Sequence, residues 1–312
     1  MALPHFVHSR SDGISSVALV VMWSSGFVGA ELGSRAHAAP LTLLGWRFTA
    51  LALLLVTVAG LRRMPWPTWQ AWRRQAVLAV LCQAGYLFLI FEGVTHGVPG
   101  GTAALVAALQ PMLVATVAGP LLGEHTTARM WVGLVLGLVG VVVVVGGGAG
   151  GSQAPLWAYL LPVAGMLCLG SGTVLERRLK PPEQLLQTVM MQSVVAATLF
   201  MVFALVFGQA TPPASLPFWR AVVWLLVLAS LGGYVMYVFV ARHQGATAVS
   251  TLLYLTPPTT MLWVFLMFGE PVTLTGLVGL VISAVGVLLV LRGRPSASQR
   301  NSSTPEPSCS IP

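Results

Sequence analysis

Long runs of apolar residues, separated by short polar or Gly- and Pro-rich segments, account for most of this chain. A hydrocarbon core of roughly 30 Å requires about 20 apolar residues of helix, and ten runs come near this length. The sequence shows no period-two alternation of polar and apolar residues, which membrane β-strands require. The pattern predicts an all-α integral membrane protein with ten transmembrane helices. The expected spans are Ile14–Leu32, Leu41–Gly60, Val77–Glu92, Gly101–Leu122, Trp131–Val145, Leu156–Val174, Leu185–Phe207, Ala221–Ala241, Ala246–Phe268 and Leu274–Leu291.

Composition supports this class and argues against others. The chain has 312 residues, of which 56% are hydrophobic and 8% charged, and its mean hydropathy is +0.85. Soluble globular proteins carry about 25% charged residues, so this chain has too little polar surface to be covered by water. A net charge of +8 alone would suggest nucleic acid, but that requires a basic face on a soluble domain. We therefore expect the lipid bilayer, and not nucleic acid, as the partner.

The basic residues indicate the orientation of the chain. If the N-terminus is cytoplasmic, 13 of the 16 Lys and Arg residues lie on the cytoplasmic side. Arg35 and Arg220 then lie outside, and Arg47 lies within a span. Positive residues favour the cytoplasmic side, so both termini are expected there, in a multi-pass protein of the cell's inner membrane. Residues 1–13 form the N-terminal segment, and the Ser- and Pro-rich tail 294–312 is predicted to be disordered.

An alternative for the N-terminus is a secretory signal. Arg10, the first apolar run and Ala36-His37-Ala38 resemble a signal with a small-residue cleavage site. Glu31 and Arg35 fit poorly before such a site, and removal of the first helix would break the internal repeat.

Two halves of the chain carry the same landmarks. Five pairs of residues lie 146 positions apart: Pro111 and Pro257, Gly123 and Gly269, Glu124 and Glu270, Gly133 and Gly279, and Gly140 and Gly286. Each half, 14–147 and 148–293, has five expected spans, so the second half must enter the membrane with the opposite orientation. Such inverted repeats are typical of secondary transporters, whose substrate site lies near the midplane between the copies. One repeat pair could function as a monomer, or as part of a homodimer.

The residues also resemble a known family. Trp23-Ser24-Ser25-Gly26-Phe27 in the first span, Pro40 followed by Arg47, and the two Pro…Gly-Glu patterns resemble the drug/metabolite transporter superfamily, in its ten-helix EamA-type branch. The resemblance covers roughly Ile14 to Leu291. It implies export of metabolites or amino acids in bacteria, through a cavity lined mainly by the first, third and fourth helices of each half. The chain departs from the pattern at Pro271, which follows Glu270, and in the sixth span, which lacks a clear copy of the Trp23 motif.

Three charged residues are candidates for coupling or gating. Arg47 lies within a span, where a charge costs about 2.5–3.5 kcal/mol or more; it either faces the pathway or extends to the outer interface. Glu31 and Glu92 end the first and third spans near the outer mouth, where they could exchange protons with bulk water. The sequence does not decide whether transport is coupled to a proton or another ion.

Proline removes an intrahelical hydrogen bond, so Pro111 and Pro257 are expected to kink their helices and free carbonyls toward a cavity. A purely architectural bend is the alternative, and interfacial anchoring is the alternative for some of the tyrosines. The residues expected to line the substrate pathway are Trp23, Gln83, Tyr86, Gln110, Pro111, Tyr234, Tyr237, Tyr254, Thr256 and Pro257.

The sequence thus predicts an exporter of small metabolites or amino acids that works by alternating access. A flippase for lipid-linked substrates is one alternative, although only Arg47 suits a basic lateral opening. An intramembrane enzyme is another, but the chain has neither a Gly-x-Ser-Gly motif nor a His-Glu-x-x-His helix. Its three cysteines and scattered histidines show no metal-ligand spacing, so no metal or cofactor is expected.

Overall fold

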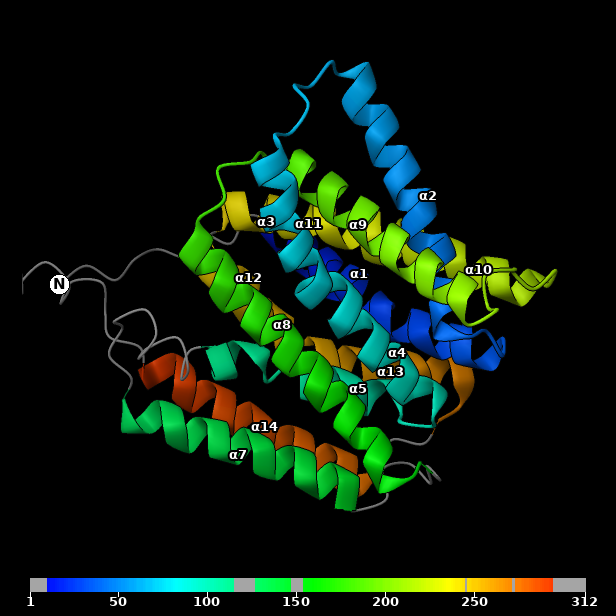
Figure 1. The fold of residues 1–312 in the computed structure, drawn as a ribbon. Helices are drawn as coiled ribbons and strands as arrows, with labels where there is room; N and C mark the ends of the chain where they lie inside the picture. The colour runs from blue at the N-terminus through cyan, green and yellow to red at the C-terminus, as the bar shows by residue number, and fades with distance from the viewer. Residues whose placement is uncertain (1–9, 115–126, 147–153, 245, 271–272, 294–312) are drawn as a thin grey trace, which may run out of the picture.

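The computed structural model of the chain describes residues 10–114, 127–146, 154–244, 246–270 and 273–293. Within them, eight helices are long and apolar enough to cross a membrane, and two shorter apolar helices, Gly100–Val114 and Leu274–Leu289, correspond to the fourth and tenth expected spans. The predicted all-α membrane fold of two five-helix repeats is confirmed (Figure 1). Gly123, Glu124 and the tail 294–312, which carried predictions, lie outside the described residues.

The helices follow one another in the order of the expected spans. They are α1 (Arg10–Arg35), α2 (Pro40–Leu61), α3 (Trp69–Ala79), η1 (Val80–Gly85), α4 (Tyr86–Thr95), α5 (Gly100–Ala107), α7 (Ala128–Gly146), η3 (Leu156–Tyr159), α8 (Leu160–Leu179), α9 (Leu185–Val206), α10 (Leu216–Trp224), η4 (Leu225–Gly232), α11 (Gly233–His243), α12 (Ala246–Leu253), α13 (Thr256–Phe268) and α14 (Leu274–Gly293).

The third and eighth spans contain a π-helical segment that the sequence pattern did not predict. The third span runs without interruption from Trp69 to Thr95 and includes η1; the eighth runs from Leu216 to His243 and includes η4. Tyr86 follows η1 directly, and Tyr234 is the second residue after η4. Segments of this kind are frequent at functional sites. The third span also starts earlier than expected: Thr68 caps α3 through its side-chain oxygen, and the span begins at Trp69 and not at Val77.

The fourth and ninth spans are broken and not merely kinked. Turns at residues 108–109 and 254–255 separate α5 from the helical residues 110–114, and α12 from α13. Pro257 therefore lies in the first turn of α13, where a backbone N–H would have no partner within the helix, so its missing N–H costs no helical hydrogen bond. The two breaks fall 146 residues apart, as the repeat requires.

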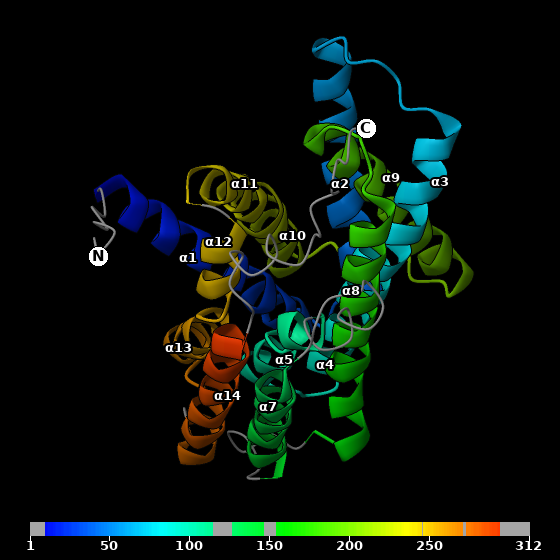
Figure 2. The same cartoon turned by 90° about the vertical axis from the view of Figure 1, so that its left-hand side faces the viewer.

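The fifth and tenth spans, α7 and α14, lie side by side in both views (Figures 1 and 2). A Cβ added to Gly286 would lie 2.5 Å from the Gly133 carbonyl oxygen, and one added to Gly279 would lie 2.5 Å from the Gly140 carbonyl oxygen. Gly133 and Gly279 are equivalent in the repeat, and so are Gly140 and Gly286. Replacing each residue by its equivalent turns one contact into the other, which is the relation expected of a pseudo-two-fold axis. Ser283 donates to the Gly137 carbonyl oxygen at 3.2 Å between them.

The first helix of each half packs on the π-helical segment of the other half. Gly29 of α1 meets Leu225 of η4, and Gly172 of α8 meets Cys82 of η1. The second helices, α2 and α9, also pair between the halves, with Phe48 and Phe200 stacked at 5.7 Å between ring centroids. The two irregular spans of each half therefore face the opposite half, which places the candidate site between the halves.

Candidate functional site

Arg47 is buried between the two halves and does not extend to the outer interface. Its residue is 7% exposed, and Nε donates to Ser230 Oγ of η4 at 3.1 Å. The guanidinium carbon lies 4.9 Å from the ring centroid of Phe48 and interacts electrostatically with Tyr86 after η1. Arg47 thus connects the π-helical regions of both halves, and none of the ion pairs in the described part of the chain includes it.

Trp23 and Tyr237 form an aromatic pair across the halves. The indole of Trp23 on α1 lies 5.6 Å from the ring of Tyr237 on α11, at an interplanar angle of 30°. Tyr234, one turn earlier on α11, is half-buried. An aromatic pair of this kind offers an apolar surface with a polar edge, which suits the hydrocarbon part of a small polar molecule.

Each helix break is joined by a hydrogen bond to the first helix of the opposite half. Ser24 of α1 donates to the carbonyl oxygen of Thr256 at 3.4 Å, directly before Pro257. Gln110, directly before Pro111, donates to Thr173 of α8 at 2.9 Å. The sequence predicted a kink at each proline, and the structure places a break two to three residues before it and adds the partners of Gln110 and Thr256.

Two buried hydroxyls lie beside the second break. Thr256 and Thr260 on α13 are 4% and 0% exposed, and neither Oγ1 has a hydrogen-bond partner within the described residues. An unsatisfied buried hydroxyl costs about 1–3 kcal/mol, so these groups favour a polar ligand or water at this position. Tyr254 stands in the turn of the break and packs against the buried cluster of α5, α7 and α8.

A chain of amide side chains runs from η1 toward the end of α3. Gln83 donates to Gln192 at 3.3 Å, Gln192 donates to Gln75 at 2.9 Å, and Gln75 donates to Glu183 at 3.1 Å. Arg74 forms an ion pair with the same Glu183. Because α3 belongs to the first half and residues 183–192 to the second, this chain, named here the inner latch, joins the halves.

Glu183 lies outside the spans, between α8 and α9, with 7% of its side chain exposed. Burial alone would raise its pKa, but the hydrogen bonds from Arg74 and Gln75 outweigh burial and hold the pKa of Glu183 below its usual value. The carboxylate therefore stays charged, and the latch intact, at neutral pH.

The opposite ends of the helices are joined by a second ion pair, named here the outer latch. Arg35 of α1 donates to Glu270 after α13 at 2.8 Å, and to Glu31 one turn earlier at 3.1 Å. Arg35 also lies 4.3 Å from the ring centroid of Phe268. Glu92 pairs instead with His96 on its own helix at 3.5 Å. Glu31 and Glu92 thus have different partners, and only Glu31 belongs to a contact between the halves.

Sequence reasoning missed Ser230, Thr173, Gln75, Gln192 and Glu183. Each lies in an apolar helix or a short loop, where one polar residue carries no periodic signal, and its role appears only when the partner from the other half is in place. Gln75 carried a weak signal, because an amide at a position that becomes fully buried needs a partner.

Ten apolar spans, two inverted halves and broken helices facing the centre define an integral membrane transporter of the inverted-repeat class. The model of the EamA-like transporter family matches residues 13–146 and again 156–292, and the chain belongs to this family.

Curated relatives agree in length with this chain. A "Probable terminal-alkyne amino-acid exporter" of Streptantibioticus cattleyicolor is 28% identical and covers 93% of this chain and 96% of its own. The "Uncharacterized inner membrane transporter YedA" of Escherichia coli K12 is 24% identical, with 89% of each chain covered. A "Probable amino-acid metabolite efflux pump" of Salmonella typhimurium is 20% identical, with 91% and 96% covered. A crystal structure with a TM-score of 0.63 and 21% identity covers 92% of this chain and 99% of the other, which shows a shared fold.

Proposed function

We propose that this protein exports small carboxylate-bearing metabolites, of the amino-acid type, across the inner membrane by alternating access. The family is one of transporters. Two relatives are named as exporters or efflux pumps for amino acids or their metabolites, and one as an inner membrane transporter. The residues between the halves support the same substrate class.

The buried guanidinium of Arg47 is the observation that carries the proposal. Inside a membrane protein a charge is strongly unfavourable unless it is paired. Arg47 has a neutral hydroxyl, Ser230, as its side-chain partner. A substrate carboxylate would complete its pairing, because guanidinium and carboxylate form a strong charge-assisted contact.

The other candidate residues suit the rest of such a substrate. Trp23 and Tyr237 present an aromatic surface to an apolar side chain. The hydroxyls of Thr256 and Thr260 offer acceptors for an ammonium group. In this assignment Gln83, Tyr86, Gln110, Tyr234 and Tyr254 complete the wall of the pathway.

The two latches support the transport mechanism. Arg35–Glu270 and Arg74–Glu183 each join the two halves, and they lie at opposite ends of the helices. Opening one while the other stays closed would expose the space between the halves to one side only. In this mechanism the inner latch faces the cytoplasm, as do both termini, and Glu31 in the outer latch is the group placed to exchange a proton with the outside.

The test is counterflow of labelled amino acids in proteoliposomes, with three competitors that share one side chain: the amino acid, its methyl ester and its decarboxylated amine. We expect saturable exchange that the amino acid inhibits and the other two do not. Arg47→Gln should lower the apparent affinity for the amino acid by about tenfold or more, because a charged hydrogen bond contributes about 1.5–3 kcal/mol.

The matched control is Arg220→Gln, which removes an exposed arginine in the middle of α10 and should leave exchange unchanged. Equal inhibition by the amine and the amino acid would contradict the role of Arg47. Folded protein that exchanges no amino acid or related metabolite would overturn the proposed function and favour a lipid-linked substrate.

A further inference from the structure

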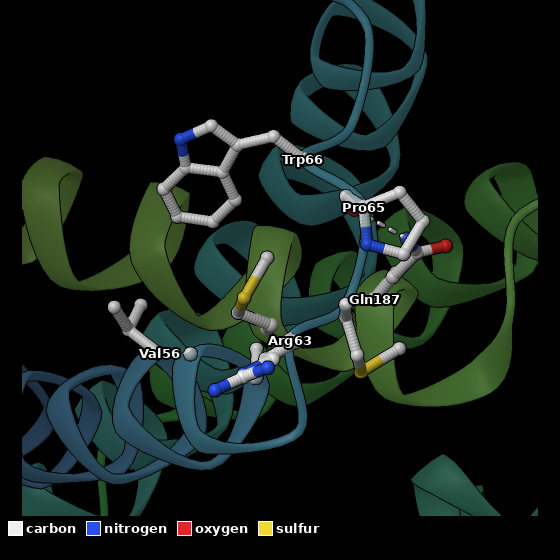
Figure 3. Close-up of a pocket in the computed structure, with 9 residues that line it drawn as sticks. Val56, Arg63, Pro65, Trp66 and Gln187 are labelled. Carbon is white, nitrogen blue, oxygen red and sulfur yellow. Dashed lines mark hydrogen bonds between the residues drawn. The ribbon is translucent and has the colours of Figure 1, made fainter.

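A pocket of about 450 Å³ lies away from the transport site, where α2 ends beside the first turns of α9 (Figure 3). Its floor is apolar and comes from Val56 and Ala59 of α2, Met64 of the following loop and Met190 of α9. Gly60 opens the pocket further, because a Cβ added there would meet nothing within 4 Å. The hydrogen bond from Gln187 to the Pro65 carbonyl oxygen, 2.9 Å long, fixes the loop against α9.

The loop that forms this pocket holds an arginine in an unfavourable backbone conformation. Met64 N–H donates to the Ala59 carbonyl and Arg63 N–H to the Gly60 carbonyl, so α2 ends in a Schellman motif with Arg63 at its left-handed position, at φ +49°. The same motif ends α4 and α9 with glycine, Gly97 and Gly208. Glycine is the favoured residue at this position. Arg63 therefore holds its side chain at the pocket at the cost of backbone strain.

The rim of the pocket is basic and aromatic. Arg63 lines the pocket, and Arg62 precedes it in the chain; both are exposed, and neither takes part in any ion pair found within the described ranges. Trp66 is 71% exposed, which is a large exposure for the most hydrophobic of aromatic side chains. In Figure 3 the indole of Trp66 and the guanidinium of Arg63 frame the side of the pocket near Val56.

The depth of the pocket identifies what covers it. It begins in the last two turns of a 22-residue apolar helix and reaches Arg63, directly after the helix end at Arg62, so it spans the boundary between hydrocarbon and headgroups. Tryptophan is enriched at that depth, and basic pockets between transmembrane helices bind anionic lipid headgroups. If water filled the pocket, its apolar floor would stay exposed to water. A zwitterionic lipid carries no net charge, so it would not neutralise the arginines beside the pocket.

We propose that this pocket is a binding site for an anionic phospholipid. The phosphate lies at Arg62 and Arg63, the indole of Trp66 covers the glycerol region, and one acyl chain lies along Val56, Ala59 and Met190. The lipid fastens the α2–α3 loop to α9 and thereby joins the two halves at this end of the molecule. The site is independent of the substrate and of the direction of transport.

Native mass spectrometry of the full-length protein tests this site, with phosphatidylglycerol and phosphatidylcholine supplied in equal amounts. We expect one phosphatidylglycerol to be retained under activation that removes phosphatidylcholine, and glycerol 3-phosphate not to be retained. Arg63→Gly should raise the melting temperature in lipid-free detergent, because glycine relieves the left-handed strain, and yet reduce phosphatidylglycerol retention at least fivefold.

His37→Gly is the matched control, since His37 occupies the same left-handed position of a Schellman motif at the end of α1, at φ +51°. It should raise the melting temperature and leave retention unchanged. Gly60→Leu fills the pocket without removing a charge and should also abolish retention. Unchanged retention in Arg63→Gly and Gly60→Leu, or equal retention of phosphatidylcholine, would overturn the proposal and leave only non-specific surrounding lipid.

Discussion

At the residue scale, Thr256 and Thr260 each bury a side-chain hydroxyl that has no hydrogen-bond partner among the described residues. Ser24 of α1 is close enough to bond to Thr256, but it donates to the Thr256 carbonyl and not to its hydroxyl. A buried hydroxyl without a partner opposes folding. Two such hydroxyls beside a helix break therefore indicate a binding site, where the protein is less stable without its ligand because these groups are kept for binding the ligand.

Replacing Thr260 by Val tests this idea, because valine keeps the shape and removes the hydroxyl. We expect Thr260→Val to stabilise the protein without substrate by about 1–3 kcal/mol and to lower the apparent affinity in counterflow. Thr198→Val is the control, since Thr198 is exposed on α9 and its hydroxyl donates to the Val194 carbonyl at 2.9 Å. If Thr260→Val changed neither the stability nor the apparent affinity, the Thr260 hydroxyl would be hydrogen-bonded to water and would not contact the substrate.

Some residues of the candidate site could be predicted from the sequence, and others could not. The matched prolines and their neighbours Gln110 and Thr256 could be found, because a repeat doubles the signal at each position. Arg47 was visible as a charge in an apolar run, but two environments were possible for it, and only the packing of α2 against η4 decides for burial. Glu183 and Gln75 were not visible, because their importance depends on contacts more than 100 residues apart.

At the element scale, apolar run length predicted all ten spans, while their internal irregularities were not predictable. A π-helical segment inserts one residue into a helix and leaves its hydrophobicity unchanged, so η1 and η4 produce no sequence signal. The breaks at 108–109 and 254–255 were expected only as kinks, because an internal proline is compatible with either outcome until tertiary partners are placed. The glycines at repeat spacing served only as landmarks of the repeat in the sequence; the structure places them in a close helix contact, as small residues often are in membranes.

The α7–α14 contact makes a prediction at this scale. Gly279→Ala adds a Cβ 2.5 Å from the Gly140 carbonyl oxygen, and backbone cannot yield as a flexible side chain can. We expect a loss of about 1–3 kcal/mol, the usual cost of overpacking, measured as a lower melting temperature in detergent. Gly60→Ala, where the added methyl meets open space, should be neutral or slightly stabilising, since alanine favours helix. Equal effects at both positions would show that the helices can separate without cost.

At the scale of the whole molecule, the two latches determine which side of the protein can open. Both are closed in this structure, and each crosses between the halves, so neither half can rotate without breaking one of them. Their strengths differ. Arg35 and Glu270 are 45% and 30% exposed, while Glu183 is 7% exposed and accepts from both Arg74 and Gln75. Exposed pairs contribute about 0–1 kcal/mol, so the outer latch is the easier one to open.

Cysteine accessibility tests this asymmetry. Cys82 on η1 and Cys168 on α8 are half-buried reporters between the halves, and Cys309→Ser removes the third cysteine of the chain. We expect Glu270→Gln to increase labelling by an impermeant maleimide from the outer side by about two- to fivefold, in line with the loss of an exposed pair. Glu183→Gln should increase labelling from the cytoplasmic side by about tenfold, because it weakens charged hydrogen bonds to a buried carboxylate.

The pH dependence follows from the lowered pKa of Glu183. A carboxylate with a depressed pKa contributes its stabilisation above its ordinary pKa and loses it only as the pH falls through the lower folded value. Cytoplasmic-side labelling of the parent protein should therefore stay constant between pH 7 and pH 5.

The matched control for the two labelling variants is Glu92→Gln. It removes a carboxylate that is paired with His96 within α4 and not between the halves, and so should change labelling from neither side. If Glu92→Gln increases outer-side labelling as much as Glu270→Gln does, then the loss of any charge near the outer mouth is enough to increase labelling. The outer latch would then have no gating role.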